Sequence, residues 1–304
     1  MGVTAWQAHC SGAGDDKITS LFLEKNFFMT DRYAVIGNPI AQSKSPQIHS
    51  AFAKVTGQDI DYTKLLAPLG GFAAAVDAFR AAGGRGMNVT APFKLDAFAY
   101  ATDLAPSAQM AGAVNALKFE GDKVHAENFD GVGLVRDLVH NLGCPIKGRR
   151  VLILGAGGAT RGALLPLLAE QPAELVIVNR TVSKAQALAA LAQQHQSGKV
   201  PVHAAAYADV VGVFDVVLNA SSSSLTAELP PLPPSVFSPD CLAYDLTYGK
   251  GLTPFLKLAQ QAGVTRLADG VGMLAEQAAE AFAWWRGVRP DTAGVIQQLT
   301  VPLV

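Results

Sequence analysis

The stretch Arg150-Val-Leu-Ile-Leu-Gly-Ala-Gly-Gly-Ala-Thr-Arg-Gly162 decides the fold of this chain. It begins as an apolar, strand-like run, turns through glycines, and leads into a helical run from Ala163 to Glu170. Glycines at such a turn let backbone N–H groups and a helix N-terminus approach a pyrophosphate. Thr160 takes the third glycine position, so the fingerprint is not strict, but its place between strand and helix predicts a dinucleotide site. A glycine-rich turn without a ligand is the alternative.

The end of the next strand-like run, Leu175–Val178, indicates which dinucleotide binds. Sites for NAD usually carry Asp or Glu there to hold the ribose hydroxyls. This chain reads Asn179-Arg180-Thr181, with Lys184 one turn further on. A guanidinium pairs with a 2′-phosphate, whereas a carboxylate would repel it. The sequence therefore predicts NADP, with ordinary surface cations at a helix start as the alternative.

Outward from this site, short apolar runs alternate with helix-like stretches. One series extends from Tyr33 to Val89 and a second from Arg150 to Asp245. This alternation is typical of βαβ units, so we expect an α/β protein with a Rossmann-type doubly wound parallel sheet. The helical, small-residue stretch Gly272–Trp285 is a candidate to pack on the first series. Residues 1–28 are less patterned, and we interpret them as a leader or extension before a native start at Met29.

Composition narrows the classes of function. A chain of 304 residues, half of them hydrophobic, has room for two domains. Its 24 Lys and Arg nearly balance 25 Asp and Glu, with no basic run, which argues against a nucleic-acid partner. No apolar run reaches the roughly 18–20 residues of a membrane span, and no export signal is present. The odd set Cys10, Cys144 and Cys241, without a CxxC pair, predicts a reducing cytoplasm and neither a disulfide framework nor a zinc site.

Three polar clusters precede the glycine-rich turn: Ser43–Pro46, Asn88–Lys94 and Asn128–Gly131. We interpret them as loop positions after strands. Small hydroxyl and amide side chains suit a polyhydroxylated, anionic ligand. Reduction of a ketone needs a hydride on carbon and a proton on oxygen, and Lys94 and Asp130 are the candidates for the proton. The alternatives are a surface lysine and a helix N-cap, and which of the two transfers the proton stays open.

Three further polar residues are candidates for the same site: Asn115, Tyr248 and Gln277. Their alternatives are a turn residue, a half-buried core aromatic and a solvent-facing helix position, respectively. Packing roles are expected for four aromatic residues: His49, His125, Trp284 and Trp285.

Seven separated signatures, taken in order, resemble the shikimate dehydrogenase family. They are Gly37-Asn-Pro-Ile40 with Ser43 and Ser45, Asn88–Lys94, Ala113–Leu117, Asn128–Gly133, Gly155–Gly162, Asn179–Thr181 and Asp269–Leu274. The resemblance spans Met29 to nearly the end of the chain. It implies NADPH-dependent, reversible reduction of 3-dehydroshikimate to shikimate in aromatic amino acid (chorismate) biosynthesis. It also implies a substrate-binding domain of residues 29–129, completed by 268–304, and an NADP-binding domain of residues 130–267.

The resemblance also implies roles for individual residues. Lys94 and Asp130 correspond to the family's catalytic pair. The residues implied for the substrate are Ser43, Ser45 and Tyr248 at its carboxylate, and Asn88, Thr90, Asn115 and Gln277 at its hydroxyls. The residues implied for the cofactor are Gly155, Ala156, Gly157, Gly158 and Ala159 at the pyrophosphate, Asn179, Arg180, Thr181 and Lys184 at the 2′-phosphate, and Leu246, Gly270 and Met273 at the nicotinamide. Gln42 stands where many relatives carry His, but both serines remain.

Three other activities stay open at this point. A quinate/shikimate dehydrogenase would use quinate and often NAD. A folate-linked methylene dehydrogenase shares the two-domain layout but would not explain the paired serines Ser43 and Ser45. A non-catalytic NADP-binding regulator would have lost Lys94 and Asp130. The sequence also leaves the oligomeric state open, a homodimer included.

Overall fold

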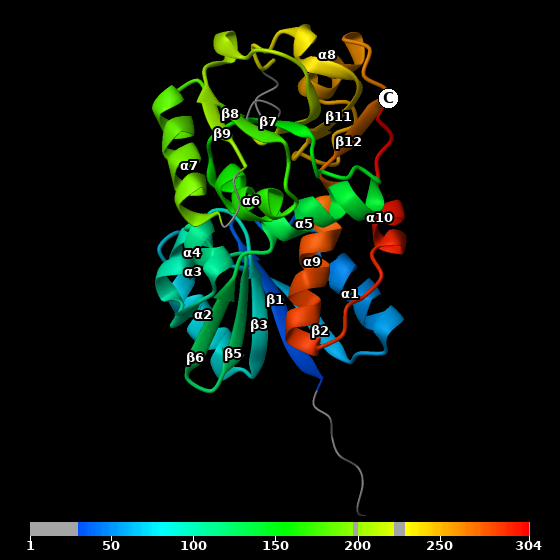
Figure 1. The fold of residues 1–304 in the computed structure, drawn as a ribbon. Coiled ribbons are helices and arrows are strands. Elements are labelled where there is room, and N and C mark those ends of the chain that lie inside the picture. Colours follow the sequence, from blue (N-terminus) through cyan, green and yellow to red (C-terminus); the bar gives the residue numbers. More distant parts are fainter. Residues whose placement is uncertain (1–29, 197–199, 222–228, 304) are drawn as a thin grey trace, which may run out of the picture. The chain divides into compact units, whose positions relative to one another are not determined.

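The glycine-rich turn belongs to a sheet of six parallel strands. A computed structural model describes residues 30–196, 200–221 and 229–303. In spatial order the strands are β12 (Arg266–Asp269), β11 (Phe237–Asp245), β10 (Phe214–Asn219), β7 (Arg150–Leu154), β8 (Glu174–Val178) and β9 (Val202–Ala205). The chain starts at the centre with β7, moves outward through β8 and β9, and resumes beside β7 with β10 (Figure 1). This order confirms the predicted doubly wound parallel sheet.

Helices cover both faces of this sheet, which is why its strands are apolar throughout. On β7, Ile153 packs into a core shared with α6 (Gly158–Ala169) and α7 (Val182–His195). Its neighbour Leu152 packs into the opposite core, which includes α8 (Pro254–Gln261). Because successive side chains of a strand point to opposite sides of the sheet, each apolar side chain of β7 is buried in one of the two cores.

The first sheet is mixed. In spatial order its strands are β2 (Ile60–Leu66), β1 (Asp31–Gly37), β3 (Gly84–Val89), β5 (Ala116–Glu120), β6 (Lys123–Glu127) and β4 (Asp103–Leu104). The predicted βαβ series is confirmed for β1, β2 and β3, which pair in parallel. The hairpin of β5 and β6 was not predicted, and it adds antiparallel pairs to β3 and between its own arms.

Two groups of helices cover the first sheet. The helices are α1 (Ser45–Thr56), α2 (Phe72–Ala81), α3 (Lys94–Tyr100), α4 (Pro106–Ala111), α9 (Val271–Arg286) and α10 (Ala293–Leu299). Residues of α2, α3 and α4 share one core with the β1 residues Ala34 and Ile36. Tyr33 and Val35, which alternate with them, share the other core with residues of α9. The late helix therefore packs on the first sheet, as the sequence predicted (Figure 1).

Of the four aromatic residues expected to pack, three contact other aromatic rings among the described residues and His125 contacts none of these. Trp285 stacks on Tyr33 with ring centroids 4.8 Å apart and donates from Nε1 to the carbonyl of Leu117. Trp284 meets Phe129 edge-on, and His49 is fully buried. The packing role predicted for His125 is wrong. His125 lies on β6, next to the edge strand β4, and its Nδ1 is 2.7 Å from the carboxylate of Asp103 on β4.

The helix α5 (Asp130–Arg136) and the π-helical turn η1 (Asp137–Asn141) follow the first sheet. Glycines let α5 approach its neighbours at backbone distance. A Cβ on Gly131 would lie 2.2 Å from the carbonyl oxygen of Gly162 in α6. A Cβ on Gly133 would lie 2.7 Å from the backbone nitrogen of Gln277 in α9. The domain limits stay a prediction, and the one drawn at residue 267 falls inside β12.

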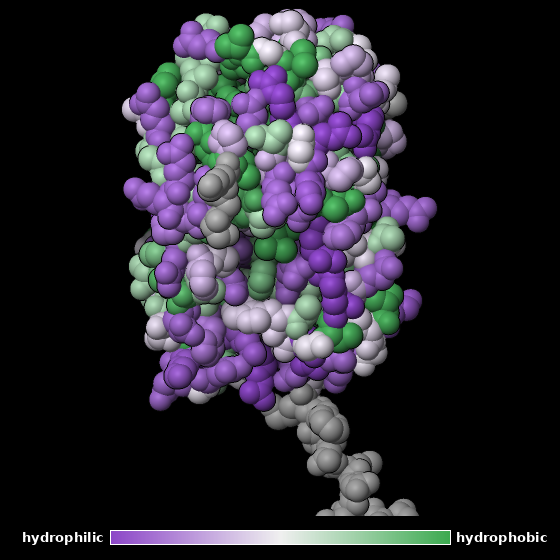
Figure 2. Space-filling model, in the orientation of Figure 1, coloured by the Kyte–Doolittle hydropathy of each residue, from purple (hydrophilic) through white to green (hydrophobic). Residues whose placement is uncertain are grey.

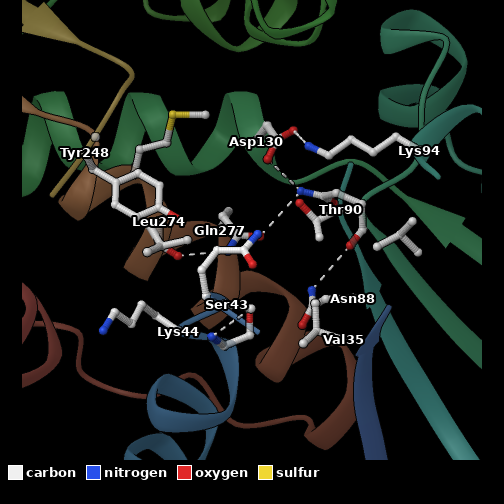
Figure 3. Close-up of a pocket in the computed structure, with 16 residues that line it drawn as sticks. Val35, Ser43, Lys44, Asn88, Thr90, Lys94, Asp130, Tyr248, Leu274 and Gln277 are labelled. Carbon is white, nitrogen blue, oxygen red and sulfur yellow. Dashed lines mark hydrogen bonds and ion pairs between the residues drawn. The ribbon is translucent and has the colours of Figure 1, made fainter. Parts of the chain in front are cut away.

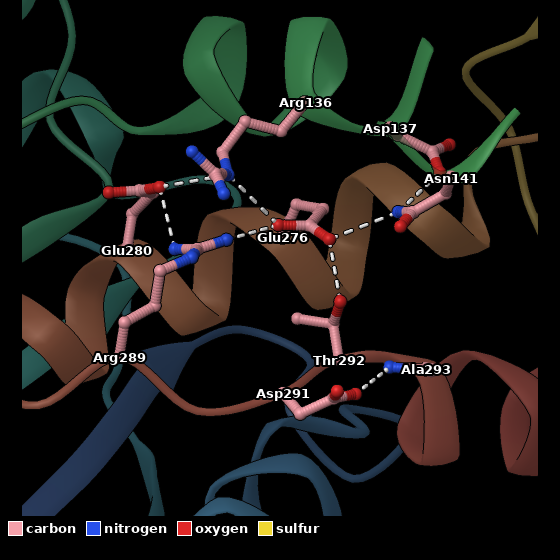
Figure 4. A network of polar contacts seen from close by, with 9 residues as sticks. All are labelled: Arg136, Asp137, Asn141, Glu276, Glu280, Arg289, Asp291, Thr292 and Ala293. Carbon is pink, nitrogen blue, oxygen red and sulfur yellow. Dashed lines mark hydrogen bonds and ion pairs between the residues drawn. The ribbon is translucent and has the colours of Figure 1, made fainter. Parts of the chain in front are cut away.

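A buried carboxylate, Glu276, ties α9 to its surroundings (Figure 4). Its side chain is 4% exposed and contacts the guanidinium groups of Arg136, 3.3 Å away, and Arg289. Its other oxygen accepts from Thr292 Oγ1 at 2.6 Å and Asn141 Nδ2 at 3.0 Å. Two cations and two neutral donors thus replace the water that this carboxylate loses on burial.

The surface of the molecule is mixed in polarity. On the face shown in Figure 2, hydrophilic residues predominate and apolar residues are scattered among them. Within the described ranges, no helix is long and apolar enough to cross a membrane. Cys144 and Cys241 are both buried. The predicted leader of residues 1–28, the start at Met29 and the residue Cys10 lie outside the described residues.

Replacing the buried carboxylate of Glu276 should lower stability more than replacing its partly exposed neighbour Glu280. We expect Glu276→Ala to lower the free energy of unfolding by about 2–4 kcal/mol, because the two guanidinium groups lose one of their two carboxylates and two neutral donors lose a buried acceptor. Glu280→Ala is the matched control, since Glu280 contacts the same Arg136 and Arg289 but is 22% exposed. It should cost about 1 kcal/mol or less. Urea unfolding measures both, and equal losses would contradict the assignment.

Candidate active site

A cavity of about 230 Å³ collects the predicted catalytic and substrate-binding residues (Figure 3). All nine line it: Ser43, Ser45, Asn88, Thr90, Lys94, Asn115, Asp130, Tyr248 and Gln277. They come from the β1–α1 connection, the first residue of α1, β3 and the turn after it, α3, the residue before β5, α5, the segment after β11, and α9. Segments separated by more than 200 residues in sequence therefore meet around one space.

Lys94 and Asp130 form the polar contact at one wall of this cavity. Lys94 Nζ lies 2.5 Å from Asp130 Oδ2, and the two side chains are 34% and 19% exposed. Each is the first residue of a helix, α3 and α5 respectively. The alternative of an N-cap at Asp130 is wrong, because Phe129 holds that position and no side chain caps the helix. The carboxylate is thus free to face the lysine.

Asn115 connects Asp130, the partner of Lys94, to α9. Its Nδ2 donates to Asp130 Oδ1 at 2.9 Å and to Gln277 Oε1 at 3.5 Å. Its Oδ1 accepts from the backbone N–H of Phe129 at 2.9 Å. Asn115 is 3% exposed, and its backbone pairs with both neighbouring strands, so it is not an isolated turn residue. Gln277 likewise lines the cavity and is not a solvent-facing helix position.

The two serines flank the start of α1. Ser43 Oγ lies 3.2 Å from Ser45 Oγ and accepts from the Ser45 backbone N–H at 3.3 Å. Tyr248 is 42% exposed, more than the half-buried core aromatic that was its alternative. Three hydroxyl groups are thus available around one part of the cavity, which suits a carboxylate ligand.

The polar positions at β3 differ slightly from the sequence interpretation. Asn88 and Val89 belong to the strand itself, and only Thr90 to Phe93 form the connection to α3. Asn88 is 6% exposed and still lines the cavity. A polar side chain inside a buried strand has to be matched by buried partners, and Asn88 has them.

A second cavity, of about 380 Å³, lies at the glycine-rich turn. Seven of the predicted cofactor residues line it: Gly155, Ala156, Gly157, Asn179, Arg180, Thr181 and Lys184. Gly158 and Ala159 form the first turn of α6. Gly155 has φ +102°, and a Cβ there would lie 3.0 Å from the Ala220 carbonyl. Glycine is therefore required at that position.

Thr160, which replaces the third glycine of the motif, stabilises the glycine-rich turn. Its hydroxyl is buried and donates to the carbonyl of Gly155 at 2.7 Å, which closes the turn. A Cβ on Gly157 or Gly158 would meet nothing within 4 Å, so the space beside the turn at these two residues is open. This is the arrangement in which a helix N-terminus receives a phosphate.

Of the three residues predicted beside the nicotinamide, two line the first cavity and one does not. Gly270 and Met273 line the first cavity. Leu246 lines neither cavity, but a Cβ on Gly270 would lie 2.3 Å from its carbonyl oxygen. Glycine at 270 thus lets the segment after β11 approach the start of α9. In the part of the chain that the structure describes, no group of three or more His, Cys, Asp or Glu is arranged to hold a metal ion.

Known families match the chain over both sheets. The model of the shikimate dehydrogenase substrate binding domain matches residues 35–117, that of shikimate / quinate 5-dehydrogenase matches 137–227, and that of the shikimate 5′-dehydrogenase C-terminal domain matches 270–300. A shikimate dehydrogenase (NADP(+)) of Aromatoleum aromaticum is 58% identical over 270 residues, which are 88% of this chain and 96% of that protein. The chain belongs to the shikimate dehydrogenase family.

Solved structures agree with membership of the shikimate dehydrogenase family. The crystal structure of an Ael1 enzyme from Pseudomonas putida is 57% identical, with a TM-score of 0.86 over 90% of this chain and all of that one. Shikimate 5-dehydrogenase from Thermus thermophilus, in complex with NADP(H) and shikimate, is 31% identical. Its TM-score is 0.75 over 88% of this chain and 97% of that one.

In this member of the shikimate dehydrogenase family, sequence reasoning missed several lining residues. Gln42 and Lys44 line the first cavity beside the serines. Their position within the first motif could have indicated them. Tyr207 lines the second cavity. Burial raises the pKa of its hydroxyl, and the nearby positive charge of Arg180 offsets only part of this rise. No sequence signal marks Tyr207, because it lies in a short helical turn after β9 that carries no motif.

Proposed function

We propose that this chain is an NADP-dependent shikimate dehydrogenase, which reversibly reduces 3-dehydroshikimate to shikimate with NADPH in aromatic amino acid biosynthesis. The contact of Lys94 with Asp130, inside a cavity lined by every predicted substrate residue, carries the proposal. The 58% identical relative named shikimate dehydrogenase (NADP(+)) supports it. The buried thiols of Cys144 and Cys241 are in keeping with a cytoplasmic location. A homodimer stays a prediction.

Substrate binding follows from the chemistry of the cavity. The hydroxyls of Ser43, Ser45 and Tyr248 would donate to the substrate carboxylate. Lys44, between the serines, adds a positive charge on the same side. The amides of Asn88 and Gln277, with Asn115 and Thr90, would bind the ring hydroxyls. Directed hydrogen bonds of this kind select hydroxylated ligands, because a missing partner leaves a buried polar group unsatisfied.

The second cavity has the donors that NADP requires. The open turn at Gly157 and Gly158, at the N-terminus of α6, suits the pyrophosphate. Arg180 and Lys184 suit the 2′-phosphate, and no carboxylate is among the lining residues within the described ranges. When bound, NADPH would supply the hydride. The nicotinamide would lie beside Gly270 and Met273, and both residues line the first cavity.

Lys94 and Asp130 would act as one acid–base unit. In the reduction, the Lys94 ammonium group hydrogen-bonds the ketone oxygen and stabilises the charge that develops on it. One proton passes from the pair to this oxygen, and the pair recovers it from solvent, to which both side chains are partly exposed. Asn115 holds Asp130 by its other oxygen, so the carboxylate stays oriented throughout.

Initial rates with shikimate or quinate, each paired with NADP or NAD, test the proposal. We expect kcat/KM to be highest for shikimate with NADP. Comparable rates with quinate or NAD would replace the proposal with a dual-substrate enzyme. No rate in any combination, from a folded protein, would point to a non-catalytic NADP-binding protein.

Lys94→Ala should lower kcat by about 10²- to 10⁴-fold and change KM for shikimate far less. The reason is that the lysine's contribution grows in the transition state. Lys118→Ala is a matched control, because Lys118 is 30% exposed and pairs with Glu120 at 2.7 Å, but lines no part of the first cavity. Steady-state kinetics measure both variants. An unchanged kcat in Lys94→Ala would remove this lysine from the chemistry.

Arg180→Ala should raise KM for NADP about tenfold or more and leave KM for NAD nearly unchanged. Only NADP carries the 2′-phosphate that the guanidinium would bind. Arg149→Ala serves as the control, since Arg149 is 46% exposed and pairs with Asp215 away from this cavity. Equal losses for both cofactors would show that Arg180 does not read the 2′-phosphate.

A further inference from the structure

A buried aromatic pair lies behind the first cavity without lining it. Tyr62 of β2 is 8% exposed, and its hydroxyl donates to Asn88 Oδ1 at 2.6 Å. His49 of α1 is fully buried, and its ring lies parallel to that of Tyr62, with centroids 4.2 Å apart and planes at 6°. Neither belongs to the residues that line the cavity, whereas Asn88 does. Tyr62 therefore reaches the ligand space through two hydrogen-bond partners, Asn88 at 2.6 Å and the Ser45 side chain.

The surroundings of Asn88 fix which way its amide points. Asn88 Nδ2 lies 3.4 Å from the carbonyl oxygen of Asn115. A carbonyl only accepts hydrogen bonds, so the nitrogen and not the oxygen must face it. This leaves Oδ1 on the side of the Tyr62 hydroxyl. Because Nδ2 carries two hydrogens and the long contact to Asn115 uses one, the other can serve a ligand oxygen in the cavity.

The phenol of Tyr62 is a permanent donor in this position. Burial raises its pKa well above the usual value, so the hydroxyl keeps its proton. Burial also lowers the pKa of His49 to about 3, so the stacked imidazole is neutral near pH 7. Trp285 packs against the same imidazole with ring centroids 5.4 Å apart, which holds the stack in place. The Tyr62 hydroxyl therefore has a fixed position and a fixed hydrogen-bonding sense.

We propose that Tyr62 is a positioning residue that orients the Asn88 amide so that Asn88 donates to a substrate hydroxyl oxygen. The inference rests on the proposed function of the first cavity. Without the phenol hydroxyl, Asn88 Oδ1 loses its 2.6 Å donor, and the amide keeps only the 3.4 Å contact to Asn115 and its contact with the neutral His49 ring. Substrate affinity then falls, while the acid–base pair, held by Asn115, keeps its geometry.

The test compares Tyr62→Phe with Tyr33→Phe in steady-state kinetics. We expect Tyr62→Phe to raise KM for shikimate about fivefold to tenfold, with kcat and KM for NADP within about twofold of wild type. Tyr33 is the matched control, because it is also buried, stacks on Trp285 and lies on the neighbouring strand, but does not line or support the cavity. An equal rise in KM for both variants would mean a general packing effect and would overturn the inference.

Two further variants make the result specific. In an Asn88→Ala background, Tyr62→Phe should change KM for shikimate less than about twofold, since the group it orients is gone. An undiminished effect there would overturn the inference. Asn88→Asp keeps the acceptor for Tyr62 but removes the donor, so KM for shikimate should rise about tenfold or more. A wild-type KM in Asn88→Asp would overturn the inference even if Tyr62→Phe fails to fold.

Wild-type activity separates this inference from the proposed function. If the wild-type chain oxidises shikimate with NADP and Tyr62→Phe has the wild-type KM, the positioning role is wrong and the function stands. If the folded wild-type chain does not turn over shikimate, the proposed function fails first, and the role of Tyr62 toward shikimate fails with it.

Discussion

The close packing of α5 against α9 is the constraint on which the first cavity depends. Asp130 begins α5 and Gln277 lies on α9, so the distance between the two helices sets the distance between these side chains. Gly133 lets the backbones meet at Gln277, and the Glu276 contacts prevent α9 from sliding along its axis. Glu276, which lines neither cavity, thus helps to fix the helix that carries Gln277.

The second cavity depends on a different kind of constraint, one of backbone geometry. The positive φ of Gly155 and the hydroxyl of Thr160 close the turn, and the open surroundings of Gly157 and Gly158 leave room for a ligand. The first cavity is lined mostly by polar side chains, whereas the second combines the backbone of the glycine-rich turn with charged side chains such as Arg180 and Lys184. Substitutions that keep the backbone of this turn should therefore affect the pyrophosphate part of the second cavity least.

Local features of the structure could be predicted from the sequence, and long-range ones could not. The strand, glycine turn and helix at residues 150–170 are adjacent in sequence, and the structure confirms their order. The hairpin of β5 and β6 was missed, although its alternating residues around Gly121 carry a period-two signal. Lys94 and Asp130 could be named as candidates, but their 2.5 Å contact joins residues 36 positions apart. Nothing local marks Tyr62 or Glu276, because their partners lie on other elements.

The two ends of the β5–β6 hairpin differ in how much change in sequence and length they should tolerate. Its open end carries Asn115 on one side and Asn128 to Asp130 on the other, and Ala116 pairs with Glu127 there. Its closed end turns at Gly121, where φ is +59° and a Cβ would meet nothing within 4 Å. Residues added in matched pairs to both arms would lengthen the tip and leave this pairing frame unchanged. A single residue added within one arm would reverse the face occupied by the side chains between that residue and the tip. Among related chains, the tip should thus differ in length by even steps while the open end stays constant.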